Sequence, residues 1–270
     1  MPLFPFSAKA ADAIEQIRFA HSLGFAGVQD ALARQRPRDD VDRIGRTLAQ
    51  LSLEPGSMLY APMEIAKAPL WGSSDANDRH IRMRELDIAI DTAQRLGARR
   101  IAILSGLDPR MPLSLQLARF VDALREAAEL AERHGLVLCL ETINAQAVPD
   151  MLLQHIGDAY LVAKAVARAS VRLIFDTAHV QIMDGNLLTN LEAVWDSVEV
   201  IQVANVPGRI EPELGEIAML PFLNGLVARG YSGLIELEHL WATPGVEAEQ
   251  RGIAFLRHVD SLLARAPLRG

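Results

Sequence analysis

The chain contains a single cysteine, Cys139, among its 270 residues. One thiol cannot form a disulfide within the chain or build a cysteine metal cluster, so disulfide scaffolds and zinc-finger-like sites are excluded. Long apolar runs are also lacking, because none reaches the ~18 residues that a membrane span requires. The segment Met1–Phe6 has neither the basic region nor the apolar stretch of a signal peptide. We therefore expect a cytoplasmic protein without a membrane partner.

Positive charge is scarce. The sequence has 27 Lys and Arg against 34 Asp and Glu, which gives a net charge of -7. A nucleic-acid surface would need clustered basic side chains, and the basic stretches here are interrupted by acids or lie beside a strand. We expect no nucleic-acid partner, and a small molecule is the expected ligand.

Linkers are absent as well, since no low-complexity run or composition break offers a domain boundary. The chain is 50% hydrophobic, which is enough for one large core. Chains of ~250 residues commonly form one α/β barrel, so we expect a single domain over residues 1–270.

What the sequence does contain is an alternation of strand-like and helix-like segments. Eight strand–helix pairs can be counted, and eight such pairs close a (β/α)8 TIM barrel of the α/β class. No glycine-rich dinucleotide turn follows the first strand, which argues against an open doubly wound sheet. Ser74 is expected to cap the third helix. The strands are expected near 3–6, 25–29, 58–60, 100–104, 136–140, 171–175, 198–204 and 234–237, and the helices near 10–23, 41–51, 74–96, 114–133, 150–168, 189–196, 217–229 and 246–264.

Four polar residues stand in or directly after the last four apolar runs: Glu141, Asp176, Gln202 and Glu238. A carboxylate at the end of a buried strand is costly unless something neutralises it. In a parallel barrel all strand carboxyl ends open on one face, where active sites collect. Two glutamates, one aspartate and one glutamine on that face predict an oxygen-rich site for a hard divalent cation, Mg²⁺ or Mn²⁺.

Several short motifs follow one another in the second half of the chain. They are Glu141–Asn144, Phe175–His179, Ile201–Asn205, Pro207–Arg209, Gly215–Ile217 and Gly230–Gly233. Together they resemble the hydroxypyruvate isomerase family, within the wider group of xylose-isomerase-like TIM barrels. The resemblance is dense over residues 136–240 and general before them, and it suggests a homo-oligomer.

The resemblance implies roles for six positions. Glu141, Asp176, Gln202 and Glu238 match the family's metal ligands. Glu141 and Glu238 also match its pair of acid/base carboxylates, which move a proton between neighbouring carbons through an enediolate. His179 and Arg209 match positions that contact substrate oxygens. A hydroxypyruvate or 2-oxo-tetronate isomerase-like activity is thus expected, that is, an isomerase of the aldose–ketose type in carbohydrate metabolism.

The sequence departs from the family around the substrate. The segment Met58–Pro62 lacks the histidine and the glycine-rich stretch usual there, so Tyr60 and Trp71 are candidates for an altered pocket wall. A ketose or keto-sugar 3-epimerase on the same site stays open as an alternative, although those enzymes usually have histidine in place of Gln202. An AP-endonuclease-like phosphodiesterase would need several additional histidine ligands and a basic face. A barrel that only binds would not need Glu141 and Glu238.

Overall fold

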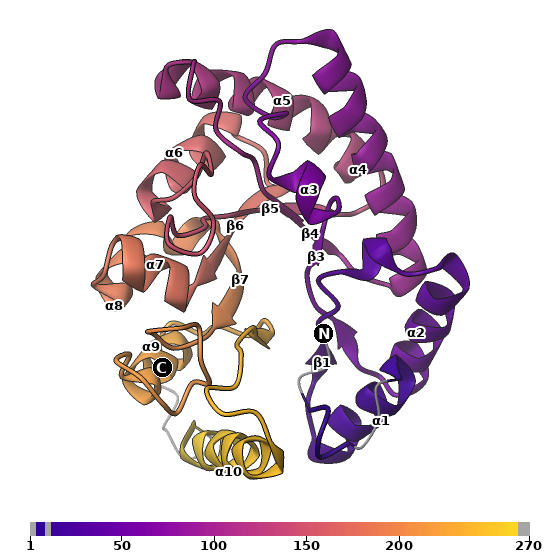
Figure 1. Ribbon diagram of the computed structural model, residues 1–270, viewed down its shortest axis with the longest axis vertical. Helices are drawn as coiled ribbons and strands as arrows, with labels where there is room; N and C mark the ends of the chain where they lie inside the picture. Colours follow the sequence, from indigo (N-terminus) through magenta and orange to yellow (C-terminus); the bar gives the residue numbers. More distant parts are fainter. Residues whose placement is uncertain (1–3, 9–11, 264–270) are drawn as a thin grey trace.

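Parallel strands curl around a central axis and helices cover them on the outside in the computed structural model, which describes residues 4–8 and 12–263 (Figure 1). Six strands form one parallel sheet in chain order, and two more pair beside it. The strands are β1 (Gly27–Val28), β2 (Glu54–Pro55), β3 (Met58–Leu59), β4 (Arg100–Ile103), β5 (Val137–Glu141), β6 (Val171–Asp176), β7 (Val198–Val203) and β8 (Ile235–Leu237).

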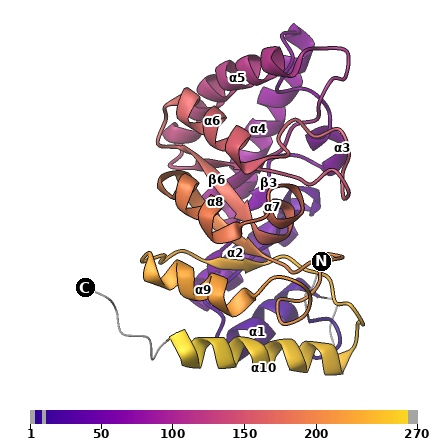
Figure 2. The ribbon, with the colours of Figure 1, turned by 90° about the vertical axis from the view of Figure 1, so that its left-hand side faces the viewer.

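The helices follow the strands around the barrel, and α9 and α10 pack against each other at one end of it (Figure 2). They are α1 (Ala13–Leu23), α2 (Arg38–Gln50), α3 (Met63–Ala66), α4 (Ala76–Leu96), α5 (Leu113–Arg133), α6 (Ile156–Val166), α7 (Thr177–Met183), α8 (Leu187–Val194), α9 (Met219–Ala228) and α10 (Val246–Leu263), with 3-10 turns η1 (Ala33–Gln35) and η2 (Trp195–Ser197). The TIM-barrel fold predicted from the sequence is confirmed.

Local sequence explains where the helices begin and end. Asp12 caps α1 by accepting hydrogen bonds from the backbone N–H groups of Ile14 and Glu15. Asp75 caps α4 in the same way, so the expected cap at Ser74 is off by one residue. Gly24 and Gly97 close α1 and α4 in the left-handed conformation, which glycine adopts without strain.

The barrel core is one cluster of buried side chains contributed by the strands and the inner helix faces. The strand side chains Ile101, Leu138 and Phe175 are fully buried, as expected for parallel strands covered on both faces. Phe175 stacks on Phe222 of α9 with ring centroids 6.1 Å apart. No helix within the described residues is both long and apolar enough to cross a membrane.

The expected first strand near residues 3–6 is wrong. Residues 5–7 form a turn, and Leu3 lies outside the described residues. Pro2 and Pro5 bracket the segment, and proline cannot donate to a strand ladder. Phe4 instead packs among the rings of Phe19 and Phe25, with centroid distances of 5.9 Å.

Two further differences lie beside the site. The short helix α7 starts directly after Asp176 and was not predicted as a separate element, while α6 begins at Ile156 rather than near 150. The side chain of Asp176 caps α7 by accepting from the backbone N–H of His179 at 2.8 Å. This cap fixes His179 next to the carboxyl end of β6.

Candidate functional site

The carboxyl ends of β5 to β8 bring the predicted site residues to one face of the barrel. Asp176 at the end of β6 lies directly opposite Gln202 of β7 in the strand register. The backbone N–H of Glu238 donates to Val203 at 3.2 Å, which places Glu238 just beyond the end of β8. Glu141 ends β5. The parallel register therefore places four side chains from four neighbouring strands on one face, as expected.

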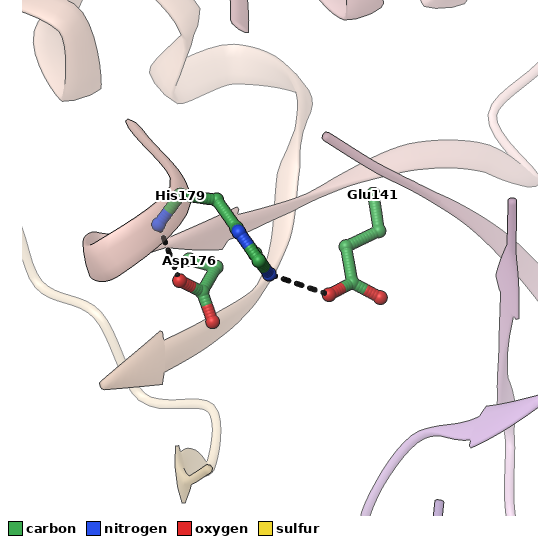
Figure 3. A group of neighbouring side chains, drawn as sticks. All are labelled: Glu141, Asp176 and His179. Atoms are coloured by element: carbon green, nitrogen blue, oxygen red, sulfur yellow. Dashed lines mark hydrogen bonds and ion pairs between the residues drawn. The ribbon is translucent and has the colours of Figure 1, made fainter. Parts of the chain in front are cut away.

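Two of these side chains gather closely with His179 of α7: Glu141, Asp176 and His179 have ligand atoms within 4.8 Å of one another (Figure 3). All three are buried. In Figure 3 the imidazole lies between the two carboxylates, with its Nε2 atom 3.9 Å from Oε1 of Glu141. Buried oxygen and nitrogen atoms at this spacing are a group that could hold a metal ion.

Arg209 reaches into this group from the loop after β7. Its Nη2 atom lies 2.9 Å from Oδ2 of Asp176 and 3.4 Å from Oε2 of Glu238, and its Nη1 atom lies 2.7 Å from Nε2 of His179. Its backbone adopts φ 54°, after Gly208 at φ 88°, so the loop turns sharply toward the strands. Arg209 thus supplies positive charge among the carboxylates.

Both ring nitrogens of His179 face hydrogen-bond donors. The Oδ1 atom of Asn144 accepts from the backbone N–H of Ala147 at 2.8 Å, which leaves its Nδ2 atom as the donor. Both Nδ2 and the backbone N–H of Asn144 point at Nδ1 of His179, at 2.7 and 3.2 Å. The guanidinium of Arg209, which can only donate, lies 2.7 Å from Nε2. A neutral imidazole has one acceptor nitrogen, so Asn144 and Arg209 compete to set its tautomer.

Gln202 is oriented by a residue that the sequence reasoning left out. Its Nε2 atom donates to Oε2 of Glu236 at 3.1 Å, so its Oε1 atom is free for another partner. Glu236 is buried and also accepts from the backbone N–H of Ser57 at 2.6 Å and from the Ser57 hydroxyl at 2.7 Å. Gln29 donates to the same hydroxyl at 3.3 Å. These hydrogen bonds hold the carboxylate of Glu236 in place, and Glu236 in turn orients the amide of Gln202.

Within the described residues, three buried oxygen atoms of the predicted ligands accept no well-aligned hydrogen bond. Oδ2 of Asp176 and Oε2 of Glu238 face the guanidinium of Arg209 as ion pairs, and Oε1 of Gln202 has no hydrogen-bond partner in the described part of the chain. Buried polar atoms almost always have a partner, so the amide oxygen needs an explanation. Carboxylate and amide oxygens are the ligands that Mg²⁺ and Mn²⁺ prefer. The donor set therefore fits a hard divalent cation.

The protonation of the site follows from its burial. Burial, followed by the nearby charges of Glu238 and Asp176, raises the pKa of Glu141 well above its ordinary value. Burial raises the pKa of Glu238 to about 7, although Arg209 opposes this shift. Burial also lowers the pKa of His179 to about 4, so this ring is neutral at pH 7. Two carboxyl groups with raised pKa values in one cavity are typical of proton-transfer sites.

A cavity of about 220 Å³ opens beside these groups. It is smaller than the ~300–1,000 Å³ of sites for drug-sized ligands, so it fits a small molecule. Tyr60 and Trp71, which the sequence suggested for its wall, do not line it. Both are buried in the core and pack edge to face at 5.4 Å. The residues that line the cavity are Gln29, Ala31, Ser57, Met58, Leu59, Met63, Ala102, Leu104, Glu141, Ile143, Ala147, Val148, His179, Gln202, Arg209 and Glu238.

The sequence reasoning missed Asn144, Glu236 and Gln29 as supporting residues. Asn144 belongs to the motif Glu141–Asn144, but the sequence indicated no role for it. Its contact with His179 shows that it supports the imidazole ring. A signal for Glu236 was present, because alternation in a strand places it on the same side as Glu238. A signal for Gln29 was present too, because it ends the expected strand near 25–29, next in barrel order to the strand near 58–60 that Ser57 precedes.

Comparison with known proteins agrees with this geometry. Residues 17–259 match the family model described as xylose isomerase-like TIM barrel. The chain is 28% identical over 247 residues to a 2-oxo-tetronate isomerase of Pectobacterium atrosepticum, which covers 87% of this chain and 92% of that protein. It is 30% identical over 254 residues to a putative hydroxypyruvate isomerase of Homo sapiens, which covers 90% of this chain and 87% of that protein. The chain belongs to the xylose isomerase-like TIM barrel family, and the resemblance found in the sequence is confirmed.

Solved structures share the fold. An AP endonuclease, family 2, from Brucella melitensis superposes with a TM-score of 0.78 at 26% identity, covering 91% of this chain and 92% of that one. A D-psicose 3-epimerase from Clostridium cellulolyticum H10, crystallised with D-tagatose, gives a TM-score of 0.78 at 17% identity over 94% of both chains. The second likeness is one of fold alone.

Proposed function

We propose that this protein is a divalent-metal-dependent isomerase of small hydroxy-keto acids or related sugar derivatives. The observation that carries the proposal is the pair of carboxyl groups, Glu141 and Glu238, with raised pKa values beside one small cavity. The isomerase names of the curated relatives support the same reaction class.

The oxygen atoms of Glu141, Asp176, Gln202 and Glu238 would hold the metal, Mg²⁺ or Mn²⁺. When bound, such an ion supplies Lewis acidity, which stabilises negative charge on substrate oxygens by several kcal/mol. His179 is a poor ligand despite its position. Its Nδ1 atom faces two donors of Asn144, and its Nε2 atom faces the guanidinium of Arg209.

The reaction would proceed by proton transfer between neighbouring carbons. One glutamate removes the proton from the carbon that bears the hydroxyl group, and the electron pair of the broken C–H bond moves toward the adjacent carbonyl to form an enediolate. The other glutamate, protonated at the start, gives its proton to the former carbonyl carbon. The hydroxyl proton passes to the former carbonyl oxygen as the hydroxyl oxygen becomes the new carbonyl. Proton exchange with water then restores the first glutamate to its ionised form and the second to its protonated form. Positioned acid–base catalysis of this kind contributes typically 10² to 10⁴-fold.

With Arg209 turned from His179 toward the substrate, both side chains would bind substrate oxygens as hydrogen-bond donors. The two donors of Asn144 would then keep Nδ1 as the acceptor and leave the hydrogen on Nε2. The ring is neutral because burial lowers its pKa to about 4. Burial lowers the pKa of Arg209, but the surrounding carboxylates, Asp176 first, outweigh burial and raise it. Arg209 also offers charge to a substrate carboxylate. Its withdrawal from Asp176 toward the substrate would leave the carboxylate oxygens to the metal.

The experiment that tests the function follows isomer formation by NMR in D₂O with Mg²⁺, over three- to six-carbon keto acids and ketoses. We expect exchange of the proton next to the carbonyl and a product in which the carbonyl has moved by one carbon. A product that differs only in stereochemistry would instead support the 3-epimerase, which the same two carboxylates could serve. No exchange with any substrate would contradict both.

The expected setting of the enzyme follows from the resemblance. We propose that it works in the cytoplasm on a small-molecule substrate and assembles as a homo-oligomer. Size-exclusion chromatography with light scattering measures the mass directly, and a mass of 29.6 kDa, that of one chain, would contradict the oligomer.

A further inference from the structure

The lining of the cavity has a polar and an apolar part, called here its polar half and its apolar half. The polar half comes from the ends of β5, β7 and β8, from α7 and the loop after β7, and from Gln29 and Ser57. The apolar half is formed by side chains of β3, α3 and β4, by Ala31 and Leu104, and by the segment that follows β5. This apolar half consists of Ala31, Met58, Leu59, Met63, Ala102, Leu104, Ile143, Ala147 and Val148.

None of the side chains in the apolar half can donate or accept an ordinary hydrogen bond. Much of their backbone is occupied as well. The N–H groups of Leu59 and Ile143 donate to Ala31 and Leu153 at 2.9 and 3.1 Å. Those of Ala147 and Val148 donate to the side chain and the backbone carbonyl of Asn144 at 2.8 and 3.1 Å. Met58, Leu59, Ala102 and Leu104 are buried, so a substrate hydroxyl group placed against them would lose its water partners without gaining a side-chain partner.

Charge is distributed as unevenly as polarity. Arg209 is the one cationic side chain among the described residues that line the cavity, and it lies on the polar half. It contacts Asp176 and Glu238 there. With one arginine and one divalent ion on the same half, a single carboxylate can be neutralised, and only at that end. The substrate must therefore place its acid and its reacting carbons against the polar half.

On the basis of the proposed function, we propose that the substrate is a 3-hydroxy-2-oxo acid whose chain ends in an unsubstituted alkyl group. The carboxylate, the 2-oxo oxygen and the 3-hydroxyl face the glutamates, His179 and Arg209. The terminal methyl or short alkyl group packs against Met58, Met63 and the other apolar side chains. A terminal hydroxyl group would remain without a partner in this half.

The test compares two substrates that differ by one oxygen atom: 3-hydroxy-2-oxobutanoate and 3,4-dihydroxy-2-oxobutanoate. Exchange of the C3 proton is followed by NMR in D₂O with Mg²⁺, and kcat/KM is obtained for each. We expect the methyl compound to be preferred by about 10- to 100-fold, the range that an apolar pocket gives for one hydroxyl group. Equal values, or preference for the dihydroxy acid, overturn the substrate proposal and leave the proposed isomerase standing. No exchange with either acid, or with the wider set of keto acids and ketoses, overturns the proposed function itself.

Variants of the wall give a second, independent readout. Met63→Gln introduces an amide at a half-buried position of α3, and Val148→Thr introduces a hydroxyl group at nearly constant volume. Each should shift the ratio of the two kcat/KM values toward the dihydroxy acid, by about 10-fold for Met63→Gln. Leu161→Gln, at a side chain that is 62% exposed on α6, is the control and should leave the ratio unchanged. A ratio that stays the same in both wall variants overturns the placement of the alkyl end.

Discussion

At the scale of the residue, the carboxylates of the site differ from surface carboxylates because burial makes their charge costly. Glu141→Gln and Glu238→Gln keep the volume and remove the base, so each should lower kcat by ~10² or more. Steady-state kinetics measures the loss, and circular dichroism should show an intact fold. Glu216→Gln, at an exposed residue near the same face, is the matched control and should retain full activity. Substantial activity in either site variant would refute the two-carboxylate mechanism.

The proton on His179 can be moved by changing one atom of its neighbour. In Asn144→Asp, the oxygen that replaces Nδ2 faces Nδ1 of His179, so Nδ1 must carry a hydrogen. The Nε2 atom then loses its donor role toward the substrate, and kcat should fall by about 10². ¹⁵N chemical shifts of the ring report the tautomer directly. Asn190→Asp serves as a control, since Asn190 donates to Gly185 outside the cavity. An unchanged tautomer in Asn144→Asp would contradict the assignment.

The amide of Gln202 should respond to Glu236 in a similar way. Glu236→Gln brings an NH₂ group into contact with Gln202, whose Oε1 atom must then turn to accept from it. This removes Oε1 from the metal site, and loss of such a supporting contact typically costs 10- to 100-fold in metal affinity. Isothermal titration with Mn²⁺ measures the change, with Glu216→Gln as the reference. Equal affinity in the two variants would show that Glu236 does not orient the ligand.

Much of the site could be predicted from single residues, and the reason is topological. Glu141, Asp176, Gln202 and Glu238 lie on neighbouring parallel strands, so their sequence positions already determined that they would share one face. Supporting contacts such as Asn144 with His179 depend on the path of a loop, which residue patterns do not specify. The prediction that Tyr60 and Trp71 line the pocket was wrong, because the sequence does not specify which way their rings point. Both pack into the core, and the ring of Phe120 lies 5.9 Å from that of Trp71.

At the scale of the element, periodicity predicted the long helices well and the short segments poorly. The expected helix over 114–133 and the observed α5 differ by one residue, because many apolar side chains define its buried face. The segments near residues 3–6 and α7 contain few residues each. In such segments a proline or a single cap decides the structure, and no periodic pattern can form.

Alanine favours helices more than glycine does, yet close helix packing should make one glycine-to-alanine substitution destabilising. A Cβ atom on Gly45 in α2 would lie 2.1 Å from the backbone oxygen of Arg95 in α4, whereas one on Gly157 in α6 would meet nothing within 4 Å. Gly157→Ala should therefore stabilise the protein by up to ~1 kcal/mol, and Gly45→Ala should destabilise it by ~1–3 kcal/mol. Urea denaturation measures both. A gain in stability for Gly45→Ala would mean that α2 and α4 approach less closely.

At the scale of the whole molecule, the site works against the stability of the barrel. Several carboxyl groups are buried around one arginine. Three oxygen atoms of the site, from Asp176, Gln202 and Glu238, accept no aligned hydrogen bond within the described residues. If residues 1–270 form one domain, as we propose, this local cost is carried by a single cooperative unfolding transition. Metal binding should then raise the stability of the entire chain, because the ion binds the folded form.

The pH dependence of stability should therefore change sign with the metal. The folded pKa of Glu238 is about 7, above its ordinary 4.5, and that of Glu141 is raised as well. The folded state thus binds more protons than the unfolded chain between these values. In the presence of a chelator, the contribution of these two groups to the free energy of unfolding is fully present below about pH 4.5 and is lost as the pH rises through 7. In the presence of Mg²⁺ their contribution should increase over the same pH interval, because only the ionised carboxylates bind the ion.

Urea denaturation at pH 5, 6, 7 and 8, with EDTA or with Mg²⁺, measures both slopes. Other groups titrate in the same range, so the informative quantity is the difference in the free energy of unfolding between the parent protein and Glu238→Gln. In EDTA this difference should move in favour of the variant as the pH rises, because the amide cannot ionise. Its size will be reduced by water, since the Glu238 side chain is 32% exposed. In Mg²⁺ the parent should gain on the variant with rising pH. If the difference in EDTA stayed constant from pH 5 to 8, Glu238 would be ionised throughout this range in the folded state, would have an ordinary or lowered pKa, and could not serve as the proposed acid.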